Sequence, residues 1–65
     1  MTNNQAFQQV IAINIHFQIA ENDLAYEYSV RNNDIDNMRM VLRAYGKDFS
    51  DDAAKTQIEV AKQFI

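Results

Sequence analysis

The chain has 65 residues, enough for one domain that buries only about 60% of the surface of its unfolded form. Nine acidic and six basic side chains give a net charge of −3, which disfavours nonspecific binding to nucleic acid because phosphate contacts supply most of that affinity. The absence of cysteine excludes disulfides and thiolate metal sites, so association with a partner is the usual stabilising device left to so small a domain.

The first predicted element is a β-strand over residues 7–19. Every odd position of the stretch IAINIHFQI, residues 11–19, is apolar, and the side chains of a strand alternate between its faces with a period of two. Many of these residues are β-branched, which also favours a strand. A helix is the alternative, because Phe7 and three isoleucines recur at every fourth residue, but Ile13 and Phe17 would then lie on the opposite side.

A second alternating stretch, LAYEYSVR, is predicted to form a strand over residues 24–31. The four residues that separate the two stretches are mostly polar turn formers, which favours a β-hairpin. In the expected register Phe17 lies opposite Tyr26, and the apolar faces of the two strands coincide along their length.

The apolar spacing changes to that of a helix after this point. A helix is predicted over residues 34–45, with Asn33 as its N-cap and Gly46 as its stop. A second helix is predicted over residues 51–64, starting from Ser50 as N-cap.

Residues 1–65 are therefore predicted to form one α+β domain, a β-hairpin followed by two α-helices packed on one face (ββαα). The first strand is longer than the second, and a long apolar edge favours pairing with another chain. A second copy related by two-fold symmetry would complete a continuous four-stranded antiparallel sheet. If residues 1–9 instead fold back or stay disordered, the domain is a monomer. The predicted dimer interface consists of Phe7, Gln9, Ile11 and Ile13.

No catalytic or metal-binding signature is found in the sequence. His16 is expected opposite Glu27 as a structural cross-strand pair, because no nucleophile or oxyanion donor accompanies it. The stretch NNDIDN, residues 32–37, imitates the start of a calcium loop, but Asn37 stands where a glycine is needed and Arg43 where a bidentate glutamate is needed. We therefore expect no enzymatic activity, no cofactor and no metal.

Three basic residues recur at every fourth position along the first predicted helix and just after it, with a methionine beside them. A solvated helix face is the ordinary explanation of such a stripe. The more specific interpretation is a docking surface for an acidic partner, because arginine binds carboxylates in bidentate fashion and methionine adapts to irregular surfaces. The candidate partner-binding residues are Arg39, Met40, Arg43 and Lys47.

The predicted order strand, helix, helix over residues 24–65 resembles that of ribbon-helix-helix repressors, which dimerise through an intermolecular β-ribbon. The connection from Gly46 to Ser50 resembles the loop before the second helix of that family. The resemblance implies a dimeric regulator that reads DNA with basic or amide side chains of its strand. A preceding strand has no place in that fold. The outward residues of the predicted strand also depart from the family's pattern; they are Ala25, Glu27, Ser29 and Arg31.

We expect a small non-enzymatic protein-binding module that acts as an inhibitor or adaptor of a larger protein, by analogy with accessory proteins of phages and mobile elements. The alternative is a dimeric nucleic-acid-binding transcriptional regulator that uses Arg31 together with the basic stripe. The opening MTNNQAFQQ has no positive charge, so no secretory signal is expected. The longest uninterrupted apolar run, residues 10–13, is too short for a membrane span, and the expected location is the cytoplasm.

Overall fold

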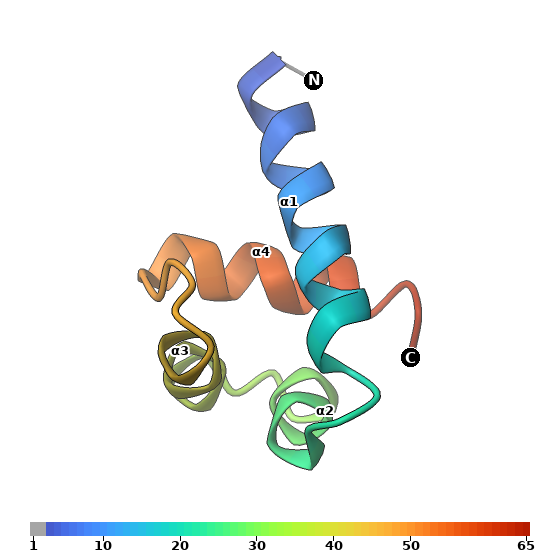
Figure 1. Cartoon of the computed structure of the whole chain (residues 1–65), viewed down its shortest axis with the longest axis vertical. Helices are drawn as coiled ribbons and strands as arrows, with labels where there is room; N and C mark the ends of the chain where they lie inside the picture. The colour runs from blue at the N-terminus through green and yellow to red at the C-terminus, as the bar shows by residue number, and fades with distance from the viewer. Residues whose placement is uncertain (1–2) are drawn as a thin grey trace.

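The computed structural model describes residues 3–65 and consists of four helices (Figure 1). They are α1 (Asn3–Ile19), α2 (Leu24–Arg31), α3 (Ile35–Ala44) and α4 (Asp51–Ala61). No residue from 3 to 65 lies in a strand, so the prediction of an α+β fold is wrong and the domain is all-helical. The helices predicted over 34–45 and 51–64 correspond to α3 and α4, the latter ending three residues early.

The stretch predicted as the first strand, residues 7–19, lies within α1. The side chains of Ala12, His16 and Ile19 are buried, and their spacing of four and three residues places them on one side of a helix. A helix satisfies its backbone hydrogen bonds within the segment, whereas a two-stranded sheet leaves unpaired edges. The preference of isoleucine for strands is weak, and the packing of this buried face overrides it.

Residues 24–31 form α2 in place of the second predicted strand. The Asp23 side chain caps this helix by accepting a hydrogen bond from the backbone N–H of Ala25 at 2.9 Å. Tyr26, Ser29 and Val30 are buried and share one helix face. The predicted hairpin and four-stranded sheet are therefore wrong, and the strand on which the resemblance to ribbon-helix-helix repressors depended is a helix.

Two helix boundaries predicted from the sequence are confirmed. Gly46 follows α3 with φ +70°, and the N–H of Lys47 donates to the carbonyl of Leu42 at 2.9 Å, which closes the helix end. Ser50 caps α4, because its hydroxyl accepts a hydrogen bond from the N–H of Ala53 at 3.1 Å.

The boundary between α2 and α3 differs from the predicted one by one residue. Asn33 does not cap α3; it ends α2 in the left-handed region, with φ 52°. The N–H of Asp34 donates to the carbonyl of Ser29 at 2.9 Å, as the residue after a left-handed stop commonly does. Asp34 is the N-cap of α3, and its side chain accepts from the N–H of Asn37 at 3.0 Å.

Helix α4 is the centre of the fold, because it packs against each of the other three helices. In Figure 1, α1 and α4 cross in the plane of the view, whereas α2 and α3 lie below them and are seen nearly end-on. The apolar core is drawn from all four helices and consists of Ile19, Tyr26, Val30, Met38, Val41, Leu42, Ala54, Ile58 and Ala61.

The first half of α1 extends beyond the rest of the molecule along its 31 Å long axis (Figure 1). Every residue from Asn3 to Ile11 is exposed, and the first buried residue is Ala12. A monomeric domain was expected to have residues 1–9 folded back or disordered. This stretch is helical from residue 3 onward, and residues 1 and 2 lie outside the described residues. Over the described part of the chain, none of the helices is both long and apolar enough to cross a membrane.

Candidate functional site

Helix α3 has two contrasting faces. Met38, Val41 and Leu42 are buried in the core. Met40 and Arg43 point away from that core and are exposed, as the period of 3.6 residues per turn requires. The exposed face of α3 therefore presents a methionine and an arginine one turn apart.

A hollow of about 270 Å³ lies between this face and the connection that leads to α4. We call it the α3 hollow; it is lined by Asp36, Arg39, Met40, Arg43 and Phe49. Met40 is 70% exposed and Phe49 is 44% exposed, so two large apolar side chains border the hollow in contact with solvent. Aromatic residues, methionine and arginine are the side chains enriched in protein–protein interfaces.

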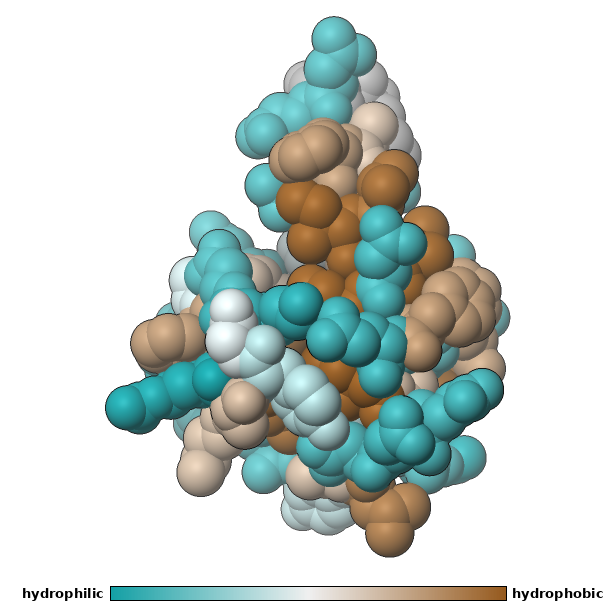
Figure 2. Space-filling view, in the orientation of Figure 1, coloured by the Kyte–Doolittle hydropathy of each residue, from teal (hydrophilic) through white to brown (hydrophobic). Residues whose placement is uncertain are grey.

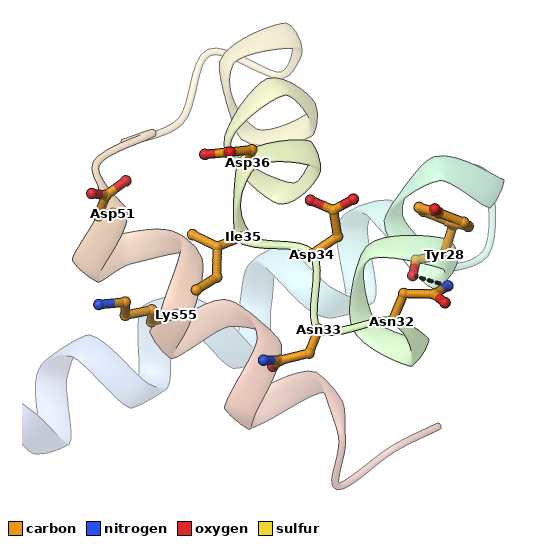
Figure 3. Close-up of a pocket in the computed structure, with 8 residues that line it drawn as sticks. All are labelled: Tyr28, Asn32, Asn33, Asp34, Ile35, Asp36, Asp51 and Lys55. Carbon is orange, nitrogen blue, oxygen red and sulfur yellow. Dashed lines mark hydrogen bonds between the residues drawn. The ribbon is translucent and has the colours of Figure 1, made fainter.

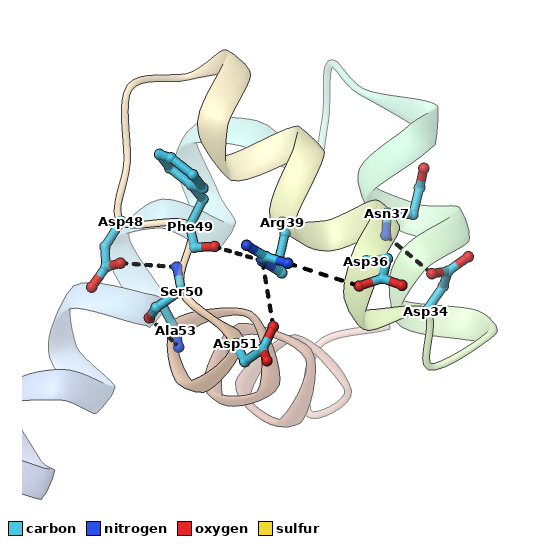
Figure 4. A network of polar contacts seen from close by, with 9 residues as sticks. All are labelled: Asp34, Asp36, Asn37, Arg39, Asp48, Phe49, Ser50, Asp51 and Ala53. Atoms are coloured by element: carbon cyan, nitrogen blue, oxygen red, sulfur yellow. Dashed lines mark hydrogen bonds and ion pairs between the residues drawn. The ribbon is translucent and has the colours of Figure 1, made fainter.

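The Arg39 guanidinium shapes one wall of the α3 hollow (Figure 4). Its Nε donates to the backbone carbonyl of Phe49 at 2.9 Å and lies 3.4 Å from Asp51 Oδ1, at the start of α4. Its Nη1 also lies 4.0 Å from Asp36 Oδ1 on its own helix. Arg39 therefore holds the α3–α4 connection against α3 and fixes the position of Phe49, and its charge is shared by two carboxylates of the same chain.

The Arg43 side chain differs from Arg39 in having no acidic partner within residues 3–65. Its guanidinium carbon lies 5.6 Å from the centroid of the Phe49 ring, within range of a cation–π interaction. This contact places the guanidinium near the aromatic ring and uses none of its N–H groups. Its N–H donors therefore stay available to an acceptor outside the domain.

The structure places three of the four predicted partner-binding residues together. Arg39, Met40 and Arg43 line the α3 hollow, whereas Lys47 follows the Gly46 turn and lines a separate groove of about 290 Å³ between α1 and the α3–α4 connection. The helix has ended before Lys47, so the regular spacing of the basic stripe no longer applies there. Sequence reasoning missed Phe49, whose only signal is an aromatic residue in an otherwise polar connection.

The four predicted dimer-interface residues do not form a strand edge. They lie in α1, where a period of two places them on different sides of the helix. Phe7 is 62% exposed, whereas Ile11 faces the groove beside the α3–α4 connection and Ile13 is half-buried. Gln9 is exposed beside α4.

A buried polar cluster joins α1, α2 and α4. His16 Nδ1 lies 2.9 Å from Tyr26 Oη, and Gln57 Nε2 donates to the same hydroxyl at 2.9 Å and to the carbonyl of Ala12 at 2.8 Å. Burial lowers the pKa of His16. Burial also raises the pKa of Tyr26, against the opposing effect of the hydrogen bond from Gln57. The polar groups of this cluster are satisfied by one another, which is the arrangement of a structural network.

The expected cross-strand pair of His16 and Glu27 is not formed, because neither residue lies in a strand. The Glu27 carboxylate accepts a hydrogen bond from Arg31 Nε at 2.9 Å, one turn along α2. The His16 ring is instead stacked on Phe64, with centroids 5.0 Å apart. The histidine is therefore a core residue rather than half of an acid–base pair.

A larger hollow than the α3 hollow, of about 590 Å³, is an open depression between the α2–α3 turn and α4 (Figure 3). Asp51 and Lys55 lie at one end of it and Tyr28 at the other, with the remaining side chains spread between them. The Asp34 carboxylate in its wall is already used to cap α3. Residues 3–65 contain no group of three histidine, cysteine or acidic side chains that could hold a metal ion. This depression therefore lacks the converging groups that a catalytic or metal site requires.

The α3 hollow is thus the site in which exposed apolar side chains and an arginine without an acidic partner are held together. No family model matches the chain, and no curated protein or solved structure matches it significantly.

Proposed function

We propose that this protein is a small non-enzymatic module that binds another protein through the α3 hollow and acts as an inhibitor or adaptor by covering part of that partner. The observation that carries the proposal is the cation–π contact of Arg43 with Phe49 beside the exposed Met40. Anchors of interfaces are commonly an arginine or aromatic side chain in a partly preformed pocket. The proposal places the module in the cytoplasm, on the sequence argument that the chain has no cysteine for a disulfide.

The chemistry of the α3 hollow favours an acidic, amphipathic segment as its occupant. An apolar side chain of the partner fits between Met40 and Phe49 and removes their exposed surface from water. A carboxylate next to it reaches Arg43, which binds carboxylates with two parallel N–H donors. Because Arg43 is already held by the ring of Phe49, little side-chain freedom is lost when the pair forms.

Nucleic acid is a poorer fit to this surface. Its affinity comes from several phosphate contacts made at once, whereas in the α3 hollow the charge of Arg39 is shared by Asp36 and Asp51, which leaves Arg43 to bind a single anionic group. Binding to DNA is therefore a result that would contradict the proposal.

The test is a selection of binders from a random peptide display library on the wild-type protein. The enriched peptides are expected to combine an apolar side chain with aspartate or glutamate, and to perturb the NMR signals of the Met40 methyl group and the Phe49 ring. A double variant, Met40→Ser with Arg43→Glu, is expected to weaken their binding by about tenfold or more. The matched control is Lys55→Glu, an exposed charge reversal on α4 outside the α3 hollow, which should leave binding unchanged.

Two results would overturn the proposal. The first is a set of peptides without acidic residues that binds the double variant as well as the wild type. The second is submicromolar binding of duplex DNA that weakens steeply as salt is added, which would favour the nucleic-acid-binding regulator.

A further inference from the structure

Helix α1 has a second apolar face, opposite the one that it packs on the domain. Its residues are spaced by four, three and four positions, and we call them the outer stripe of α1: Ala6, Val10, Ile13 and Phe17. Val10 is 55% exposed and Phe17 is 63% exposed, although both are large and apolar. Ile13 is half-buried, and one edge of the Phe17 ring is in contact with Phe64, with centroids 5.1 Å apart. The opposite face carries the buried Ala12, His16 and Ile19. One helix therefore presents apolar side chains to the core and to solvent at once.

The spacing of the outer stripe is that of a helix–helix seam. Apolar residues that alternate at three and four positions occupy the a and d sites of a heptad and pack against a second helix. The flanking positions of such a seam usually carry charges that select the partner. Here the flanking residues Phe7, Gln9 and Asn14 are uncharged.

The first half of α1, which carries Ala6 and Val10 of the outer stripe, projects beyond the rest of the molecule (Figure 1). Figure 2 shows apolar side chains on the side of the projecting helix that faces the viewer. Each residue from Asn3 to Ile11 is exposed, and a helical segment this short is marginal in water unless something packs against it. A helix laid along the outer stripe would supply that packing.

The distribution of charge identifies the occupant. All aspartate, glutamate, lysine and arginine side chains of the chain follow residue 20, and together they give a net charge of −3. Two copies of the acidic body repel each other, so an uncharged surface is the one that two copies can bring together. A foreign helix with charged flanks would find no opposite charge on α1, whereas a second α1 presents an equally uncharged seam.

The sizes of the side chains identify the direction of pairing. In an antiparallel pair the small Ala6 lies opposite the large Phe17 of the second copy, and Val10 lies opposite Ile13. In a parallel pair Ala6 would face Ala6 and leave a gap, while Phe17 would crowd Phe17. The antiparallel arrangement also places the two acidic bodies at opposite ends of the helix pair.

We propose that this protein forms a homodimer through antiparallel packing of the outer stripe of α1 on that of a second copy. This interface replaces the strand pairing expected from the sequence and does not involve the α3 hollow. The contact is a single helix pair, smaller than the roughly 800 Å² per partner of standard interfaces, so the dimer dissociates in the micromolar range or above.

The first experiment is sedimentation velocity of the wild-type chain from about 10 µM to about 1 mM, a range that brackets a weak dimer. The wild type is expected to shift from monomer to dimer within this range. Val10→Lys buries a charge in the seam and is expected to raise the dissociation constant about a hundredfold or more. Asn4→Lys introduces the same charge on α1 outside the outer stripe and is the matched control, expected to dimerise like the wild type. A wild-type chain that stays monomeric at the highest concentration overturns the proposal.

The second experiment tests the direction of pairing and exploits the absence of native cysteines. An equimolar mixture of Ala6→Cys and Phe17→Cys chains is expected to form the mixed disulfide under mild oxidation, because antiparallel packing brings these positions together. Disulfide formation by the Ala6→Cys chain alone, at the same rate as in the mixture, overturns the antiparallel arrangement. Circular dichroism of each variant confirms that its fold is retained. Val10→Lys should still bind peptides at the α3 hollow, because the substitution lies on α1. Loss of dimerisation and loss of peptide binding are therefore measured separately.

Discussion

His16 Nδ1 and Tyr26 Oη lie 2.9 Å apart inside the core. Gln57 Nε2 donates to the same hydroxyl oxygen at 2.9 Å. That oxygen can accept a second hydrogen bond, but its own hydrogen then needs another acceptor, so the arrangement that satisfies every group of the contact has Tyr26 donating to an unprotonated Nδ1. Protonation of Nδ1 would turn this nitrogen into a donor and leave the Tyr26 hydroxyl hydrogen without its acceptor.

Acidification should therefore destabilise the domain. The unfolded chain binds a proton at His16 near the ordinary pKa of 6.5, whereas burial lowers the pKa of the folded form. Between these two values the unfolded state binds more protons, so the stability present above pH 6.5 is lost as the pH falls through the lowered pKa. We expect the melting temperature to decrease from about pH 7.5 to about pH 5.5, measured by circular dichroism.

The control for this pH dependence is His16→Asn. The Oδ1 atom of asparagine can accept the Tyr26 hydrogen bond in place of Nδ1 but has no proton to gain in this range. The variant should therefore melt at a nearly constant temperature over the same pH interval. The charged side chains that line the same hollow as the histidine, Glu21, Glu27 and Arg31, are unchanged in this variant. If the melting temperature of His16→Asn falls with pH as much as that of the wild type, those three side chains and not His16 cause the pH dependence.

Removal of the Tyr26 hydroxyl should destabilise the domain by about 1–3 kcal/mol, because the buried His16 Nδ1 loses its donor and Gln57 loses one of its acceptors. The measurement is urea unfolding of Tyr26→Phe. Tyr28→Phe is the matched control, since Tyr28 lies on the same helix but is 54% exposed, and it should change the free energy of unfolding by less than about 0.5 kcal/mol. Equal effects of the two substitutions would show that the network is not stabilising.

Opposite effects are expected at the two left-handed helix ends. Asn33→Gly should raise the free energy of unfolding by a few tenths of a kcal/mol to about 1 kcal/mol, because glycine adopts its φ of 52° without strain. Gly46→Ala should lower it by about 1 kcal/mol. A Cβ at Gly46 would meet no atom within 4 Å, so the backbone angle of +70° alone is responsible. Chemical denaturation of both variants measures these two changes in the free energy of unfolding. A Gly46→Ala variant that is more stable than the wild type would contradict the role given to the backbone angle of Gly46.

The two arginines of the α3 hollow should behave differently. Arg39→Ala is expected to broaden or shift the NMR signals of the Phe49 ring, because the hydrogen bond that holds its carbonyl is lost. The accompanying loss of stability should stay below about 1 kcal/mol, since the Arg39 pairs are partly exposed. Arg43→Ala should leave stability within about 0.5 kcal/mol of the wild type. A Phe49 ring that keeps its signals in Arg39→Ala would show that the connection is held by other contacts.

The second half of the fold could be predicted from the sequence and the first half could not. In α3 and α4 the apolar spacing fits only a helix, and Gly46 and Ser50 mark boundaries by local backbone chemistry. In α1 the isoleucines at positions 11, 15 and 19 satisfy a period of two and a period of four at once. The choice between strand and helix depended on α4, against which the helical face packs, and a single sequence does not reveal that contact.

The candidate site, like the fold, could be predicted from the sequence only in part. Arg39, Met40 and Arg43 share a helix face that the spacing predicts. Phe49 joins them only because the connection turns back over α3, and the restraint on Arg39 arises from the same turn. Contacts of this kind depend on the path of a loop, which has no periodic signal.

The central position of α4 has a consequence for the order of events during protein synthesis. Of the four helices, α1 leaves the ribosome first, but the helix against which it packs emerges after the other three. Gln57 and Ala12, which are hydrogen-bonded, are 45 positions apart. A nascent chain that ends before Asp51 holds α1, α2 and α3 without their common neighbour, and its core cluster lacks Ala54, Ile58 and Ala61. We therefore expect this domain to fold in one step after α4 has left the exit tunnel, since no smaller part encloses a core.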